Sequence, residues 1–227
     1  MLWALYTNLI VSVVVLGSTL KPGVFFRYSN LGYCALGLIV QRVWSDHKNT
    51  AFSYGETVRG LLLDRAGISK NEMYLGADAP RMQEARAECG DTCGPDGEWP
   101  GAWNRGQMGR MEAHGGWVAR PEALMKLVRA TTRPYCQHTG CILSARSMEA
   151  LTARPEVAGS SATQWYGLGW KVNKWGNSWH TGGMPGTSSL LVRTSSGFAW
   201  ALAFNTRGFQ GNMDQLMWDA VKCANWQ

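Results

Sequence analysis

Residues capable of chemistry gather in three short motifs. The first is Tyr28-Ser29-Asn30, the second is His114-Gly115-Gly116-Trp117, and the third is His180-Thr181-Gly182. Their phenol, amide, imidazole and hydroxyl groups can exchange protons or hydrogen bonds with a substrate. Taken singly, the three motifs are typical of a helix cap, a turn and a strand end. The sequence contains no H-E-x-x-H, no G-x-S-x-G and no glycine-rich phosphate loop, which removes the usual support for three common enzyme classes.

Taken together, the motifs resemble the serine β-lactamase and penicillin-binding-protein superfamily, in particular its class C β-lactamase-related branch of esterases and peptidases. The segment Tyr166-Gly167-Leu168-Gly169-Trp170, the segment Leu61 to Ile68 and Asn205 agree with the same family. The resemblance extends over most of the chain and matches the carboxy-terminal part of the fold. We therefore expect a β-lactamase/transpeptidase-like α+β fold whose amino-terminal part is missing.

The resemblance implies a role for each motif. In that family, an S-x-x-K serine is acylated by the substrate and the lysine accepts its proton. Tyr28 is then implied to relay protons, Asn30 to orient substrate and lysine, and His180, Thr181 and Gly182 to bind substrate along the cleft. Family members with lysine in the third motif have a fixed cation, whereas histidine carries only partial charge near neutrality. This departure counts against penicillins and favours esters or amides with a less demanding anionic group. Backbone N–H groups near the third motif and at the missing serine are implied to form the oxyanion hole.

The tetrad Ser18-Thr19-Leu20-Lys21 satisfies S-x-x-K by its letters. The serine and lysine of the family must share one helix face at i and i+3, but Lys21 precedes Pro22, and a residue before proline avoids the helical region. The tetrad also lies too close to Tyr28 for the family pattern. We interpret Ser18 and Lys21 as turn residues and expect no nucleophile, and hence negligible acyl transfer, in this chain.

The predicted function is hydrolysis, through an acyl-enzyme, of an ester, amide or β-lactam-like substrate, either a small molecule or a peptide. This hydrolase is expected to be inactive as the 227-residue chain. The alternatives are a non-catalytic binding protein that keeps the cleft and a membrane-anchored degenerate homologue. No cofactor and no metal ion is expected.

Helices are predicted first along the chain and strands later. Apolar residues recur at helical spacing directly after the first motif, and Gly67 and Pro121 are typical of a helix stop and a helix start. The predicted elements are helices over about 32–43, 57–65, 121–130 and 145–151, strands over 166–172, 178–182, 188–193 and 198–205, and a helix over 212–224. We expect one partial domain over 1–227, with a mainly helical region over 21–160 that contains a loop excursion over 76–115. An antiparallel sheet and the terminal helix follow over 161–227.

Six cysteines are present, and four of them form the close pairs Cys89/Cys93 and Cys136/Cys141. Close pairs in loops predict local disulfides and an oxidising location, either extracellular, secretory or periplasmic. The spacings match no common zinc site well. Cys34 falls on an apolar helical pattern and is interpreted as a small buried hydrophobe.

The net charge of +6 is scattered, with no basic run longer than a dipeptide, so binding to nucleic acid is not expected. Residues 2–20 are apolar and uncharged and are an alternative membrane anchor or signal. The lack of a basic start and the polar Thr7, Asn8 and Ser12 favour an internal helix and strand of a larger domain. An incomplete fold would expose apolar faces, which predicts a complementary amino-terminal segment as partner.

Overall fold

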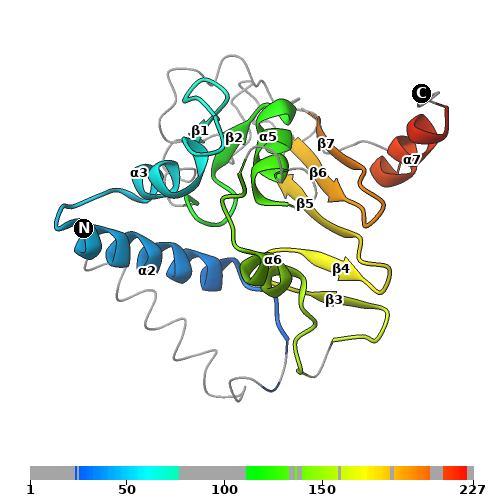
Figure 1. Cartoon of the computed structure of the whole chain (residues 1–227), viewed down its shortest axis with the longest axis horizontal. Coiled ribbons are helices and arrows are strands. Elements are labelled where there is room, and N and C mark those ends of the chain that lie inside the picture. Colours follow the sequence, from blue (N-terminus) through cyan, green and yellow to red (C-terminus); the bar gives the residue numbers. More distant parts are fainter. Residues whose placement is uncertain are drawn as a thin grey trace, which may run out of the picture.

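A computed structural model describes residues 24, 26–76, 111–132, 136, 140–157, 160–184, 187–204 and 212–223 (Figure 1). Helices dominate the first half and an antiparallel sheet the second, which confirms the predicted α+β class. In chain order the elements are α2 (Asn30–Lys48), α3 (Tyr54–Val58), η1 (Arg59–Leu63), β1 (Met73–Leu75), β2 (Trp117–Ala119), α5 (Pro121–Thr131), α6 (Ala145–Thr152), β3 (Gln164–Tyr166), β4 (Lys171–Asn173), β5 (Ser178–Met184), β6 (Thr187–Arg193), β7 (Ala199–Phe204) and α7 (Met213–Cys223).

Helix α2 begins at the first motif, as predicted. Ser29 is its N-cap, and the Ser29 side chain accepts a hydrogen bond from the Gly32 N–H at 3.1 Å. The helix ends at Asn49, which adopts a left-handed conformation with φ of 50°. It is therefore longer than its apolar pattern indicated.

The predicted second helix begins three residues early, at Tyr54, because Ser53 and Glu56 form a capping box. From Arg59 it continues as the π-helix η1. The Arg59 guanidinium donates to the carbonyl oxygens of Ile68 at 3.1 Å and Met73 at 2.6 Å, so it joins η1 to β1. The turn after the helix includes Gly67, whose φ is 67°.

A two-stranded ribbon that the sequence did not predict lies on either side of the loop excursion predicted over 76–115. Strands β1 and β2 pair antiparallel, and the Gly76 N–H donates to the Gly116 carbonyl at 2.7 Å. The core beside this ribbon is formed by the buried side chains of Leu63, Ile68, Met73 and Ala123. Residues 77–110, with Cys89 and Cys93, lie outside the described residues.

The main sheet has five antiparallel strands in the sequential order β3-β4-β5-β6-β7. The predicted meander is confirmed, but the prediction of one strand over 166–172 was wrong. A turn divides that segment into β3 and β4, with a hydrogen bond from the Gly167 N–H to the Trp170 carbonyl at 2.7 Å. Gly169 has a φ of 83°, which glycine adopts far more readily than other residues.

Helix α7 covers one face of this sheet, as predicted from its apolar face. The sheet contributes the buried Leu190, Val192 and Trp200. Trp218 of α7 makes an edge contact with Trp200, with ring centroids 5.0 Å apart. The helix therefore anchors the carboxy-terminal end of the described chain on the sheet.

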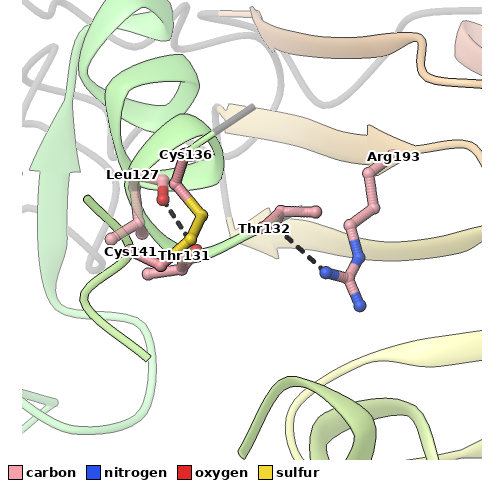
Figure 2. The surroundings of a disulfide bond; sticks show 6 residues. All are labelled: Leu127, Thr131, Thr132, Cys136, Cys141 and Arg193. Carbon is pink, nitrogen blue, oxygen red and sulfur yellow. Dashed lines mark hydrogen bonds between the residues drawn. A yellow bond between two sulfur atoms is a disulfide. The ribbon is translucent and has the colours of Figure 1, made fainter. Parts of the chain in front are cut away.

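Cys136 and Cys141 form a disulfide after α5, as their spacing predicted (Figure 2). Cys136 is fully buried. Beside it, Arg193 of β6 donates to the Thr132 hydroxyl at 3.0 Å, which joins the end of α5 to the sheet (Figure 2). Cys34 is a half-buried free thiol rather than a fully buried one.

Metal-binding clusters and membrane-spanning helices are both absent from the described part of the chain. This part contains no group of three or more His, Cys, Asp or Glu side chains placed to hold a metal ion. No helix within it has the length and apolar character needed to cross a bilayer, and residues 2–20 fall outside it.

Candidate active site

The first and third motifs meet where α2 begins beside the main sheet (Figure 1). Tyr28 lies in the extended segment before α2, and His180 lies on β5. The Tyr28 ring centroid is 6.4 Å from the His180 ring and 5.7 Å from the ring of Tyr166 on β3. The fold thus brings together two motifs that lie far apart in the sequence.

Tyr28 and Asn30 form a hydrogen-bonded pair at the entrance to α2. The Tyr28 hydroxyl donates to the Asn30 side-chain oxygen at 2.9 Å. The Tyr28 side chain is 48% exposed, so its hydroxyl can also be reached from solvent. Because a phenol hydroxyl can both donate and accept, this pair can pass a proton to a bound molecule while the amide fixes its position.

His180 is held in a neutral state by its surroundings. Burial lowers the pKa of its imidazole, a hydrogen bond with the Thr181 backbone partly opposes this, and the charge of Lys171 lowers the pKa further. The Tyr166 hydroxyl lies 2.8 Å from His180 Nε2. His180 therefore offers hydrogen bonds rather than a positive charge at neutral pH, a stronger departure from lysine than the partial charge expected from its residue type.

Tyr33 and Tyr166 were assigned no role from the sequence, although both fall within the segments that carry the resemblance. Burial raises the pKa of Tyr166, and its side-chain hydrogen bond with Tyr33 adds to the rise. Phe26 stacks on the Tyr166 ring with centroids 5.4 Å apart. The sequence does place a tyrosine near each of these motif segments, and this was the signal that could have identified Tyr33 and Tyr166. The residues that they contact lie on other elements, so no local pattern predicts the contacts.

The third motif also presents a strand edge. Pairing between β4 and β5 ends at Trp179, so in the described chain the backbone from Thr181 to Met184 pairs with β6 alone. An extended substrate can add to such an edge through backbone hydrogen bonds. Successive side chains along a strand point to opposite faces of the sheet. His180 faces Tyr166, and Thr181 lines a cavity of about 550 Å³ between the sheet and α7 on the other face. The Thr181 side chain is therefore not brought to Tyr28.

A groove of about 700 Å³ opens beside Tyr28 and Tyr166. It lies between the start of α2, the end of α6 and the turn after β3, where Figure 1 shows these elements side by side. Phe26, Leu36, Pro155 and Leu168 contribute apolar surface, and Arg27 and Arg154 contribute charge. A small ester, amide or short peptide fits this size and lining.

The second motif takes a structural position. His114 lies in the turn before β2, burial lowers its pKa, and its Nδ1 is buried without a hydrogen-bond partner in the described chain. A Cβ at Gly116 would meet the backbone of Met111 at about 2.9 Å, so the turn needs glycine there. Its clearest role is to close the β1-β2 ribbon.

Neither S-x-x-K tetrad supplies a nucleophile beside Tyr28 in the described chain. Ser18 and Lys21 lie outside the described residues, as does Asn205. A second tetrad, Ser45 to Lys48, was not recognised in the sequence and lies on the last turns of α2. Ser45 accepts a hydrogen bond from the Phe52 N–H at 3.0 Å, and about 22 Å of helix separates Ser45 from Asn30. This tetrad belongs to the far end of the helix.

Comparison with known proteins adds a family match. The sequence model of the Beta-lactamase family matches residues 15–222. No match was found among the curated proteins.

Three solved structures are similar to the chain. SurE, solved with D-Leu, has a TM-score of 0.60 and 21% identity, over 89% of this chain and 43% of its own. A penicillin-binding protein from Bacillus halodurans has a TM-score of 0.57 and 19% identity, over 89% and 57%. An octameric penicillin-binding-protein homologue from Pyrococcus abyssi has a TM-score of 0.57 and 19% identity, over 84% and 41%. The chain therefore spans about half the length, or less, of these structures. At sequence identities of 19 to 21%, the similarity is evidence for the fold alone.

Proposed function

The chain belongs to the Beta-lactamase family, and from this premise we propose that it forms part of a serine hydrolase that cleaves esters or amides through an acyl-enzyme. The observation that carries the proposal is the position of Tyr28, which lines the groove, is hydrogen-bonded to Asn30 and has its ring 6.4 Å from the ring of His180. In this proposal Tyr28 transfers protons, Asn30 orients the substrate, and the strand edge at Thr181 and Gly182 binds it.

The proposed proton steps use the Tyr28 hydroxyl. During acylation, a serine oxygen attacks the substrate carbonyl carbon, and the bond to the leaving group breaks. The serine proton passes to a base, the Tyr28 hydroxyl gives its proton to the departing oxygen or nitrogen, and the base then returns the serine proton to Tyr28. Water next attacks the acyl carbon, the bond to the serine oxygen breaks, the serine oxygen takes one proton of the water, and the carboxylic acid is released. Asn30 accepts the Tyr28 hydrogen bond at 2.9 Å and so holds the phenol in place between these steps.

The proposed substrates are neutral esters and amides with an apolar acyl or side-chain group. A neutral His180 gives little attraction to a substrate carboxylate at the third motif, and most of the groove wall beside Tyr28 is apolar. Arg27 and Arg154 are the groups of this groove that would attract an anionic part of a substrate. Because the SurE structure contains D-Leu, an amide of D-leucine belongs in the substrate panel beside simple esters and a chromogenic cephalosporin. β-Lactams are the less favoured class.

A second candidate function is a non-catalytic binding protein that uses the same groove. It is favoured by the absence of an S-x-x-K tetrad beside Tyr28 in the described residues, since the groove forms from α2, α6 and β3 without one. In this case a small molecule or peptide binds reversibly. The membrane-anchored form of this protein stays an alternative that depends on residues 2–20.

We also propose an amino-terminal segment of the same fold as the partner of this chain. The support is the outer face of α2, where Leu36, Ile39, Val40 and Val43 are 42 to 63% exposed. The chain covers only 41 to 57% of the similar solved structures, so such a segment has a place in the fold. The disulfide supports an oxidising compartment for the assembled protein.

Two measurements test this function: the sequence of the native transcript upstream of Met1, and the hydrolytic activity of the full-length protein that this transcript encodes. An in-frame helical S-x-x-K segment upstream should give a protein that hydrolyses the ester panel, and Tyr28→Phe should reduce kcat about 10²- to 10⁴-fold. The 227-residue chain alone should not react with a fluorophosphonate probe. Labelling of that chain that is lost with Ser18→Ala or Ser45→Ala would place the nucleophile within it. A stop codon just before Met1, with no labelling, would exclude the hydrolase and favour the binding protein.

A further inference from the structure

We propose that the cavity between the main sheet and α7 is a binding site for a neutral sugar, which the side-chain NH₂ groups of Asn173, Asn177 and Asn212 bind. The cavity has a volume of about 550 Å³, which is in the range of small-molecule sites. Trp179 and Thr181 line it, so it lies on the face of β5 opposite His180. The site is therefore separate from the groove beside Tyr28, and the proposal does not depend on the hydrolase function.

The orientation of the Asn173 amide is fixed by the backbone. Its side-chain oxygen accepts hydrogen bonds from the N–H groups of Trp175 and Asn177, both at 3.1 Å. A reversed amide would place the NH₂ group against two N–H donors, so the oxygen must face the turn. The NH₂ group, which can donate twice, is then the end of the side chain left for a molecule in the cavity.

Asn177 and Asn212 are oriented in the same way. The Asn177 side-chain oxygen accepts from the Ser195 N–H at 3.0 Å and from the Ser195 hydroxyl at 3.3 Å. The Asn212 side-chain oxygen accepts from the N–H groups of Asp214 and Gln215 at 3.0 and 3.2 Å, at the start of α7. Within the described chain, none of the three NH₂ groups has a hydrogen-bond partner. The cavity therefore contains donors whose orientation is set before a ligand binds.

An acceptor and aromatic surface complete the lining of the cavity. Asp214 contributes a carboxyl group, which accepts a hydrogen bond from the indole N–H of Trp218. The partly buried rings of Trp179 and Trp218 contribute apolar surface. A sugar has the matching groups, because its oxygens accept hydrogen bonds, its hydroxyl hydrogens donate them, and its C–H groups contact aromatic rings.

The charge of the cavity favours a neutral ligand over an anion. Among the described residues that line it, none is Lys or Arg, and Asp214 is the one titratable group. An ionised carboxyl repels an anionic ligand. A purely apolar ligand would leave the amide NH₂ groups without acceptors, which costs binding free energy.

Nuclear magnetic resonance of the ¹⁵N-labelled 227-residue chain tests the proposal. The probes are glucose, galactose, mannose and maltose, with glucuronate as the anionic counterpart of glucose and cyclohexanol as the apolar one. At least one of these sugars should shift the side-chain NH₂ signals of Asn173 and Asn177 in a saturable way. Glucuronate and cyclohexanol should bind more weakly than that sugar. Each signal is assigned by its loss in the corresponding variant, Asn173→Asp or Asn177→Asp.

Asn173→Asp separates sugar binding from folding. Aspartate keeps an oxygen for the N–H groups of Trp175 and Asn177 but lacks both NH₂ donors. The fold should therefore persist, as the backbone amide signals of Trp175 and Asn177 report, while the Kd of the sugar rises about 2- to 10-fold. Asn49→Asp, at the exposed end of α2, adds the same charge away from the cavity and should leave the Kd unchanged.

The absence of a saturable shift with every one of these sugars would overturn the proposal, and so would unchanged binding in a folded Asn173→Asp protein. Tighter binding of glucuronate than of glucose would assign the cavity to anions, and tighter binding of cyclohexanol would assign it to apolar ligands; either result contradicts the sugar assignment. The titration of the wild-type chain decides the proposal even if the variant fails to fold. None of these readouts requires catalysis, so failure here is separate from failure of the hydrolase function.

Discussion

The ring of Tyr28 lies 6.4 Å from the ring of His180, although Tyr28 precedes the first described helix and His180 lies on the middle strand of the main sheet. The site is therefore a junction between the helical and sheet parts of the fold. Its geometry depends on contacts that hold these parts, including the Arg193 hydrogen bond to Thr132 and the close approach of α6 to the turn at Gly167. Substitutions within each part can therefore test the packing on which the site depends.

Gly37→Ala should destabilise the protein. A Cβ at this buried position would collide with Ala113 Cβ, which cannot rotate away, and would crowd the Tyr54 ring at 3.1 Å. We expect a loss of about 1 to 3 kcal/mol in the free energy of unfolding, measured by urea denaturation. Gly32→Ala in the same helix is the control: the nearest atom would lie 3.6 Å from the added Cβ, and the change should be neutral or stabilising by up to about 1 kcal/mol. Equal effects at the two positions would contradict the tight packing of α2 at Gly37.

Loss of the Cys136–Cys141 disulfide should also destabilise the fold. The bridge closes a short loop with a sequence separation of 5, and chain entropy predicts a contribution of about 2 kcal/mol. The Cys136→Ser/Cys141→Ser double variant should unfold at lower urea concentration than the wild-type protein under non-reducing conditions. Cys223→Ser, at an exposed free thiol, should have little effect. Two reactive thiols at 136 and 141 in the native protein would exclude the bridge.

Glu72 should make folding depend on pH in the acid range. Hydrogen bonds from Lys126 and from the Ser69 backbone and hydroxyl lower the pKa of its carboxyl to about 2. The unfolded chain binds this proton nearer pH 4.5, so the contribution to stability is present above that pH and is lost as the pH falls toward 2. Thermal unfolding between pH 2 and 6 should show a flatter acid limb for Glu72→Gln. Glu122→Gln, at an exposed position on the first turn of α5, is the matched control for the loss of one surface carboxylate.

Val43→Glu should leave the stability of this chain nearly unchanged and raise its solubility. The Val43 side chain is 63% exposed on the outer face of α2. Substitutions at such positions usually change the free energy of unfolding by about 0.5 kcal/mol or less, and a charge reduces the apolar patch. Val128→Glu, at a position 1% exposed in α5, should destabilise the protein severely. A loss above about 1.5 kcal/mol for Val43→Glu would mean that this face is covered in the chain itself.

The helices were predictable because their signals are local. Helix α5 begins at Pro121 with an apolar face that repeats every three to four residues, and α2 begins beside a serine cap. The three-residue strands β1 and β2 show no such period, and only their pairing across the excursion makes them strands. The turn at Gly167 to Trp170 was missed because the apolar residues around the two glycines were interpreted as one strand. The positive φ of Gly169, which marks the turn, is visible only in the structure.

The site was predictable in its motifs but not in its contacts. Tyr28, Asn30 and His180 stand out by residue type and order, and these are properties of the sequence. The partner of His180 is Tyr166, on a strand separated from it by β4, and a hydrogen bond of this kind leaves no trace in local spacing. The second tetrad, Ser45 to Lys48, is a local pattern that the sequence does contain and that was missed there, and the length of α2 places it far from Asn30.

The ribbon formed by β1 and β2 marks a position where a segment of the chain can be replaced or an insertion made. Met73 pairs with Ala119 and Leu75 with Trp117, so the segment between the two strands leaves and re-enters the fold at one place. The cost of closing such a segment rises by only about 0.6 kcal/mol for each doubling of its length. A longer or shorter segment can therefore be joined here without a change in the core around Leu63 and Ile68. A foreign domain inserted at this junction should leave the contact between the rings of Tyr28 and His180 unchanged.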